Sequence, residues 1–262
     1  MKDEIVVWMF STRVVTTQLG YALVNELCEF AHGAFRPDKY SRYEPIKTIF
    51  DATNLKESVA GLVDSQGAFL YTTGKPIRLL GMVWNRYYPP DMMLQDHLGR
   101  LQPCLPPPLF CTDLVFNVAG AWASKIGLPT ITNFASRMFE ICDADFGFVT
   151  TREDLTAKNY INRVQREGTD PSAGVPGLYW QNFFSRRYAQ WLRLGELPAW
   201  LAKTQDLTNG SVLVQFGNNL VGCRNPEILA TQRLAISFLG ENRFFDIDFP
   251  NRNLESPDWI KL

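Results

Sequence analysis

The segment Gly174–Gly195 reads Gly-Val-Pro-Gly-Leu-Tyr-Trp-Gln-Asn-Phe-Phe-Ser-Arg-Arg-Tyr-Ala-Gln-Trp-Leu-Arg-Leu-Gly. It begins with a glycine–proline turn signal, continues as an aromatic run, and then places Tyr188, Trp191 and Leu192 at helical spacing. Aromatic side chains bury large areas and dominate the energetics of protein cores and interfaces. The segment therefore predicts a turn and a buried aromatic strand that lead into a helix at the structural centre of the fold.

Strand and helix patterns are interspersed on both sides of this segment. The short apolar run Ile5–Phe10 predicts a first strand, and Leu19, Leu23 and Leu27 share one face of the helix expected after it. Further strands are expected at 68–73, 77–84, 112–118, 146–150, 211–216 and 243–249, and further helices at 48–63, 130–141, 151–164, 197–203 and 226–239. Because no regular strand–helix–strand repeat appears, we expect an α+β fold, with a largely antiparallel sheet packed with several helices in a single domain over residues 1–262.

Composition narrows the functional classes. The chain has 262 residues, of which 46% are hydrophobic and 20% are charged, as in an ordinary globular protein. Its net charge of -1 disfavours direct binding of nucleic acid, which usually requires a basic excess. Five cysteines without a CxxC pair suit reduced thiols. The start Met-Lys-Asp-Glu does not resemble a signal peptide, and no apolar run approaches the roughly 20 residues of a membrane helix, so we expect a cytoplasmic protein that does not bind membranes.

A long proline-rich loop is expected at about residues 85–110, because proline fixes φ and lacks a backbone N–H. Loops of this length in compact domains are usually functional or disordered. Tyr, Trp, Arg and Met, which are enriched in the cores of protein–protein interfaces, are common at its start. We therefore take as candidate partner-binding residues Trp84, Arg86, Tyr87, Tyr88, Asp91 and Asp96. The alternative is a loop that packs over its own domain.

Catalytic signatures are absent from the sequence. It contains no Walker A motif, GxGxxG, GxSxG or HExxH. Cys104 and His97 lie close enough in sequence to form a dyad, but their neighbours match no known nucleophile signature. Acidic residues flank the strand expected at 146–150, with Lys158 nearby, namely Asp143, Asp145, Glu153 and Asp154. Helix capping by Asp154 and a solvated rim account for these acids without catalysis, so we expect no enzyme, no cofactor and no metal.

The aromatic segment carries a family resemblance. Pro176–Phe184, Pro-Gly-Leu-Tyr-Trp-Gln-Asn-Phe-Phe, resembles a Pro-Gly-x-Tyr-Trp-x-Asn-Phe-Phe pattern of the immunity protein 52 family of bacterial polymorphic-toxin systems, and of related type VI secretion immunity proteins. The segments Gly81–Asn85, Gly210–Val214 and Leu239–Asp246 fit the same family. The resemblance covers roughly residues 40–248.

This resemblance implies an α+β cytoplasmic protein that binds a cognate secreted toxin, often a nuclease, and neutralises it by stoichiometric occlusion. The family offers no catalytic or cofactor-binding residues to carry over. Two alternatives stay open. One is an adaptor or scaffold protein of a secretion system, and the other is an uncharacterised hydrolase that uses the acids around Phe146 or the loop that holds His97 and Cys104.

Overall fold

The computed structural model describes residues 3–63, 67–85, 93–95, 101–103, 112–158, 174–244, 254–255, 257 and 259. Its strands are β1 (Ile5–Ser11), β2 (Lys39–Ser41), β3 (Thr48–Ile49), β4 (Ala68–Thr73), β5 (Leu79–Asn85), β6 (Met93–Gln95), β7 (Leu101–Pro103), β8 (Thr112–Val118), β9 (Phe146–Thr151), β10 (Gln181–Phe184), β11 (Lys203–Asp206) and β12 (Val212–Gln215). Its α-helices are α1 (Thr17–Gly33), α2 (Leu55–Val63), α3 (Gly120–Ile126), α4 (Leu128–Ile141), α5 (Arg152–Lys158), α7 (Arg186–Trp191) and α8 (Pro226–Leu239). Short 3-10 helices occupy η2 (Leu194–Glu196), η3 (Thr208–Gly210), η4 (Leu220–Gly222) and η5 (Glu241–Arg243).

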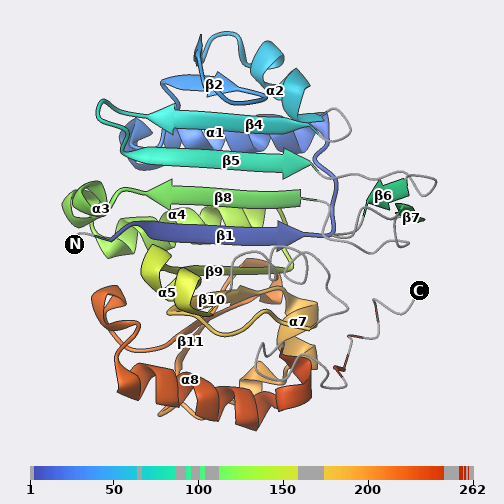
Figure 1. The fold of residues 1–262 in the computed structure, drawn as a ribbon, viewed down its shortest axis with the longest axis vertical. Coiled ribbons are helices and arrows are strands. Elements are labelled where there is room, and N and C mark those ends of the chain that lie inside the picture. Colours follow the sequence, from blue (N-terminus) through green and yellow to red (C-terminus); the bar gives the residue numbers. More distant parts are fainter. Residues whose placement is uncertain are drawn as a thin grey trace.

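Ten of these strands form one sheet in the order β11-β12-β10-β9-β1-β8-β5-β4-β2-β3 (Figure 1). All pairs of neighbouring strands in this sheet are antiparallel. The predicted α+β class with a largely antiparallel sheet is therefore confirmed. The assignment of residues 1–262 to a single domain stays a prediction.

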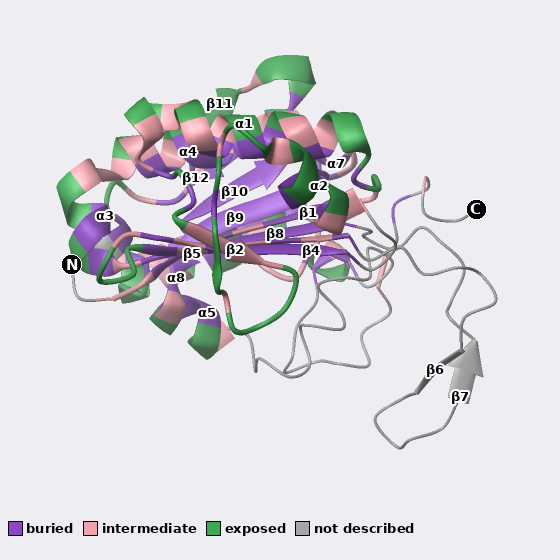
Figure 2. Cartoon of the chain, turned by 90° about the horizontal axis from the view of Figure 1, so that it is seen from above, coloured by how far each residue is buried: buried purple, intermediate pink, exposed green. Residues whose placement is uncertain are grey.

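Helices cover both faces of the sheet. In β1, Val7 and Met9 belong to one hydrophobic core, which also holds buried residues of α1, α2, α3 and α4. Val6 and Phe10 of the same strand belong to a second core, shared with α5, α7 and α8. Figure 2 shows α1 and α4 on one side of the buried strands and α5 and α8 on the other. This two-sided burial explains why β1 is an unbroken apolar run rather than an alternating one.

The aromatic segment is structural, as expected. Every residue of β10 is buried. Within this strand, the adjacent residues Phe183 and Phe184 belong to the first and second cores, respectively. The ring of Tyr179 stacks on Phe148 with ring centroids 3.9 Å apart. Asn182 holds this turn in place, because its Oδ1 accepts from the Tyr179 N–H at 2.9 Å and its Nδ2 donates to the Tyr179 carbonyl at 3.0 Å. The segment thus joins the two cores through the sheet.

Two expected helices differ from the structure. Residues 48–63 divide into β3 and α2, because the Asp51 carboxylate accepts from both the N–H and the hydroxyl of Thr53 in the turn between them. The helix expected at 197–203 is wrong. Residues 194–196 form η2 instead, and Lys203–Asp206 pairs with β12 as the edge strand β11. Strand pairing has overridden the local helical pattern in this region.

Other boundaries shift by less. The helix expected to be capped by Thr130 begins at Leu128, with Pro129 in its first turn, and the Thr130 hydroxyl donates to the Ile126 carbonyl at 2.7 Å. The helix at 226–239 begins as predicted, since the Asn225 side chain accepts from the Glu227 N–H at 2.9 Å. In the stretch expected to be an irregular loop, β6 and β7 pair with each other. Of the strand expected at 243–249, residues 245–249 lie outside the described residues. Among the helices that the structure describes, none is both long and apolar enough to cross a membrane.

Candidate functional site

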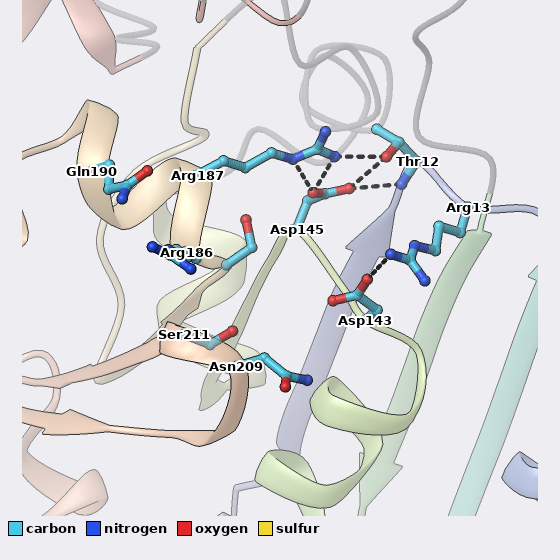
Figure 3. A pocket seen from close by; sticks show the side chains of 10 residues that line it. Thr12, Arg13, Asp143, Asp145, Arg186, Arg187, Gln190, Asn209 and Ser211 are labelled. Carbon is cyan, nitrogen blue, oxygen red and sulfur yellow. Dashed lines mark hydrogen bonds and ion pairs between the residues drawn. The ribbon is translucent and has the colours of Figure 1, made fainter.

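A polar pocket of about 310 Å³ opens at one end of the sheet, where neighbouring strands meet (Figure 3). The end of β1, the turn before β9, the junction of β10 with α7, and the turn between β11 and β12 form its walls. These elements contribute Thr12 and Arg13, then Asp143 and Asp145, then Ser185, Arg186, Arg187 and Gln190, and finally Asn209 and Ser211. Four segments far apart in the sequence thus place charged and polar side chains around one space.

The sheet itself positions Asp145. Its backbone N–H donates to the Phe10 carbonyl at 2.8 Å, and its carbonyl accepts from the Ser185 N–H at 2.9 Å. These bonds extend the ladder of β9 toward β1 on one side and β10 on the other. Asp145 is only 3% exposed, so its carboxylate requires hydrogen-bond donors from the protein.

Four donors satisfy the Asp145 carboxylate. Its Oδ2 accepts from the backbone N–H and the hydroxyl of Thr12, both at 2.8 Å. Its Oδ1 accepts from Nε of Arg187 at 2.7 Å and from Nη2 of the same guanidinium. Nη2 also donates to the Thr12 hydroxyl at 2.7 Å, and the guanidinium carbon lies 5.5 Å from the ring centre of Trp259. This closed network, drawn in Figure 3, occupies both carboxylate oxygens and suits Asp145 to fixing the pocket wall.

A second ion pair lies at the mouth of the pocket. Arg13 pairs with Asp143, and the side chains are 66% and 41% exposed. Asp143 adopts the left-handed backbone conformation, with φ of 44°, which aspartate tolerates better than most residues. Exposed ion pairs contribute little to stability, so this pair mainly neutralises charge at the pocket rim.

Two other polar side chains of the pocket lack partners within the described part of the chain. Arg186 is exposed, and among the described residues no carboxylate pairs with it. Ser185 is buried, and its hydroxyl has no hydrogen-bond partner within the same described set. Figure 3 shows Arg186 and Gln190 of α7, with Asn209 and Ser211, along the side of the pocket away from Arg13. The pocket therefore offers hydrogen-bond donors suited to binding an acceptor group.

The structure describes one of the predicted partner-binding residues, Trp84, and this residue does not line the pocket. Trp84 lies in β5, half-buried, on a different part of the sheet. The other five candidates lie outside the described residues, namely Arg86, Tyr87, Tyr88, Asp91 and Asp96. The proposed dyad of His97 and Cys104 also falls outside them.

The acids around β9 correct one expectation. A solvated rim describes Glu153, whose side chain is 67% exposed, but it is wrong for Asp145, which is 3% exposed. Capping of α5 by the side chain of Asp154 is also wrong, because this residue is 0% exposed and its Oδ2 accepts from the Thr150 hydroxyl and from Lys158. Each of these two buried carboxylates binds a cation, Asp145 through Arg187 and Asp154 through Lys158. The expected cap of α5 is confirmed at Thr151, whose hydroxyl accepts from the Asp154 N–H at 3.1 Å.

Sequence reasoning missed Thr12, Arg186 and Arg187. The available signal was the adjacent pair of arginines directly after an aromatic strand, with no acid in the first turn of the helix that follows. Arg187 pairs with the distant Asp145, whereas Arg186 has no acidic partner within the described part of the chain. In the part of the chain that the structure describes, no His, Cys, Asp and Glu side chains gather into a group able to hold a metal ion.

Comparison with known proteins adds a fold neighbour. No protein-family model matches the chain, and no curated protein matches it. A solved structure described as "Pseudomonas aeruginosa T6SS protein PA0821" is similar, with a TM-score of 0.55 and 13% sequence identity. The alignment covers 90% of this chain and 72% of that chain. At this identity the likeness shows a shared fold over nearly the whole length of the chain.

Proposed function

We propose that this chain is a cytoplasmic immunity protein that binds a cognate toxin delivered by type VI secretion and neutralises it by stoichiometric occlusion. The observation that carries the proposal is the fold shared, over 90% of the chain, with a protein described as belonging to a type VI secretion system. The aromatic segment with the immunity protein 52 pattern supports it, because Tyr179, Asn182 and Phe183 of that pattern are buried at the junction of the two cores. A pattern with this structural role can mark a fold family.

We further propose a nuclease as the toxin, following the resemblance of the aromatic segment. The chain would act without turnover, by covering the surface of the toxin that its substrate must reach. Candidate contacts are the polar pocket and the segment that begins at Trp84.

The test is a titration of purified chain against the purified product of a toxin gene found beside its own gene. We expect a stable complex and a linear loss of toxin activity that ends at about one chain per toxin. A toxin from an unrelated system is the control, and it should keep its activity at every ratio. Failure of co-expression to protect cells from the neighbouring toxin, together with absence of a complex, would contradict the proposal.

The same titration separates the alternatives. An enzyme that modifies the toxin would inactivate an excess of it, so activity would fall with time at well below one chain per toxin. An adaptor or scaffold of the secretion system would leave the activity unchanged. In a pull-down, such an adaptor would retrieve components of the secretion machinery rather than one toxin.

A further inference from the structure

Charge in the polar pocket is not balanced. Of its three arginines, Arg13 pairs with Asp143 and Arg187 pairs with Asp145. The third, Arg186, has no acidic partner among the residues that the structure describes. The pocket therefore carries one excess positive charge, although the whole chain has a net charge of -1.

The position of Arg186 is fixed by the turn between β11 and β12. Gly210 in this turn has a φ of 74°, and a Cβ built on it would lie 3.2 Å from Cδ and 3.3 Å from Cγ of Arg186. The aliphatic stem of the arginine thus lies against the glycine backbone, where most other residues would be strained by φ and crowded by the stem. The stem of Arg186 therefore packs on this turn beside the pocket.

Ser185 supplies a second signal. The residue lines the pocket and is 8% exposed, yet its hydroxyl has no hydrogen-bond partner within the described part of the chain. A buried polar group left unpaired costs free energy, because it has lost its hydrogen bonds to water. An oxygen of a bound ligand would remove this cost by accepting from the hydroxyl.

We propose that the pocket receives the carboxylate of an aspartate or glutamate side chain from the partner protein. Arg186 would form the ion pair, and the hydroxyl of Ser185 would donate to the same carboxylate. This proposal rests on the proposed function, since the partner is the toxin.

One excess charge matches one carboxylate. A nucleic acid presents a row of phosphates and is bound by several cations at once. The aspartates of the pocket do not prevent the entry of an anion, because Asp143 is paired and Asp145 accepts from four donors. The Thr12–Asp145–Arg187 network also holds the wall rigid, which reduces the entropy lost on binding.

The test measures the affinity of the whole chain for the toxin used in the titration above. We expect Arg186→Glu to weaken binding at least about 30-fold, the equivalent of roughly 2 kcal/mol for the loss of a desolvated charge pair. The matched control is Arg233→Glu, an exposed arginine on α8, which carries the same charge change and should stay within about 3-fold of the wild type.

Two further variants keep the test decisive. Arg186→Gln removes the charge without reversing it, and it should also weaken binding. It serves as the test variant if Arg186→Glu disturbs the fold. Substitution to lysine of each acid on the toxin surface should identify one toxin variant that restores binding to Arg186→Glu.

The outcomes separate the two proposals. If the wild-type chain does not bind the toxin, the proposed function fails. If the wild type binds, but Arg186→Glu and Arg186→Gln bind within about 3-fold of it, the assignment of the pocket is overturned while the function stands.

Discussion

Asp145 and Asp154 lie just outside opposite ends of β9, and both are buried, at 3% and 0% exposure. Each carboxylate binds one cation, yet the two sites differ in what surrounds the pair. Arg187, the partner of Asp145, is 40% exposed and faces a pocket. Lys158, the partner of Asp154, is 21% exposed, and its ammonium donates three hydrogen bonds to protein acceptors.

The Lys158 cluster joins three parts of the fold. The ammonium donates to Oδ2 of Asp154 at 3.0 Å, to the Leu178 carbonyl at 3.0 Å and to Oε1 of Gln232 at 2.7 Å. It thereby connects α5 to the aromatic segment and to α8. The Thr150 hydroxyl adds a bond to the same Asp154 oxygen at 2.6 Å. All three donors of the ammonium are used, so this cluster has a structural role.

The comparison shows that a buried carboxylate–cation pair has no fixed role. In the Lys158 cluster the ammonium has three acceptors, and these bonds hold helices against the sheet, while Oδ1 of Asp154 and Nε2 of Gln232 have no hydrogen-bond partner among the described residues. The Asp145 site uses the same pairing to fix one wall of an open pocket, beside Arg186, which has no acidic partner among the residues that the structure describes. Buried ion pairs cost desolvation energy wherever they occur, so the surroundings of each pair decide what it contributes to the fold.

The largest effect on stability is expected when the Lys158 cluster loses its carboxylate. Asp154→Ala leaves the Lys158 ammonium without its counter-charge in a region that water reaches poorly, so we expect a loss of about 3–5 kcal/mol in the free energy of unfolding. Denaturant unfolding measures it. Glu153→Ala removes a neighbouring acid whose ion pair with Arg224 is exposed, and should change stability by no more than about 0.5 kcal/mol. Equal effects of the two variants would contradict a structural role for the cluster.

A smaller effect is expected at the open site. Asp145→Ala removes the acceptor of Thr12 and Arg187, but the half-exposed guanidinium can be hydrated in its place, so we expect a loss of about 1–3 kcal/mol. The same denaturant unfolding applies, with Asp143→Ala as the control on the exposed pair at the rim. A loss larger than that of Asp154→Ala would reverse the comparison.

The smallest effect concerns pH. Burial lowers the pKa of Lys158, against the opposing influence of Asp154. The folded chain therefore releases this proton before the unfolded chain, whose lysine pKa is about 10.4. Between these two pKa values the unfolded state holds more protons, so the free energy of unfolding rises with pH and levels off above about 10.4. Below the folded pKa, the cost of burying the ammonium is fully present.

Urea unfolding between about pH 7 and pH 10.5 isolates this contribution as the difference between the chain and its Lys158→Met variant. Both should carry Cys223→Ala, because burial also raises the pKa of the Cys223 thiol, which interacts electrostatically with Asp154 and Lys158. Arg224, another charge that acts on Lys158, is kept in both chains. We expect the difference to grow in favour of the lysine-containing chain as pH rises. A difference that is constant or falls with pH would show that burial does not lower this pKa.

Much of the fold could be predicted from local patterns. An unbroken apolar run located β1, the aromatic segment located β10, and the Asn225-Pro226-Glu227 signal located the start of α8, because burial and capping leave recognisable residue patterns. The helix expected at 197–203 failed because Lys203–Asp206 is extended only through its pairing with β12. The secondary-structure propensity of a segment contains no information about which distant strand will pair with it.

The sequence by itself determined the α+β class and the buried aromatic strand, since these depend on the pattern of apolar and aromatic residues. Only the tertiary structure decided which charges meet. Asp145 is 42 residues from Arg187 and 133 from Thr12. Their contact depends on the strand order β10-β9-β1, which no periodicity encodes. The same fold places Arg186 at the pocket and gives the Lys158 ammonium three acceptors, so one cation is a candidate binding residue and the other has a structural role.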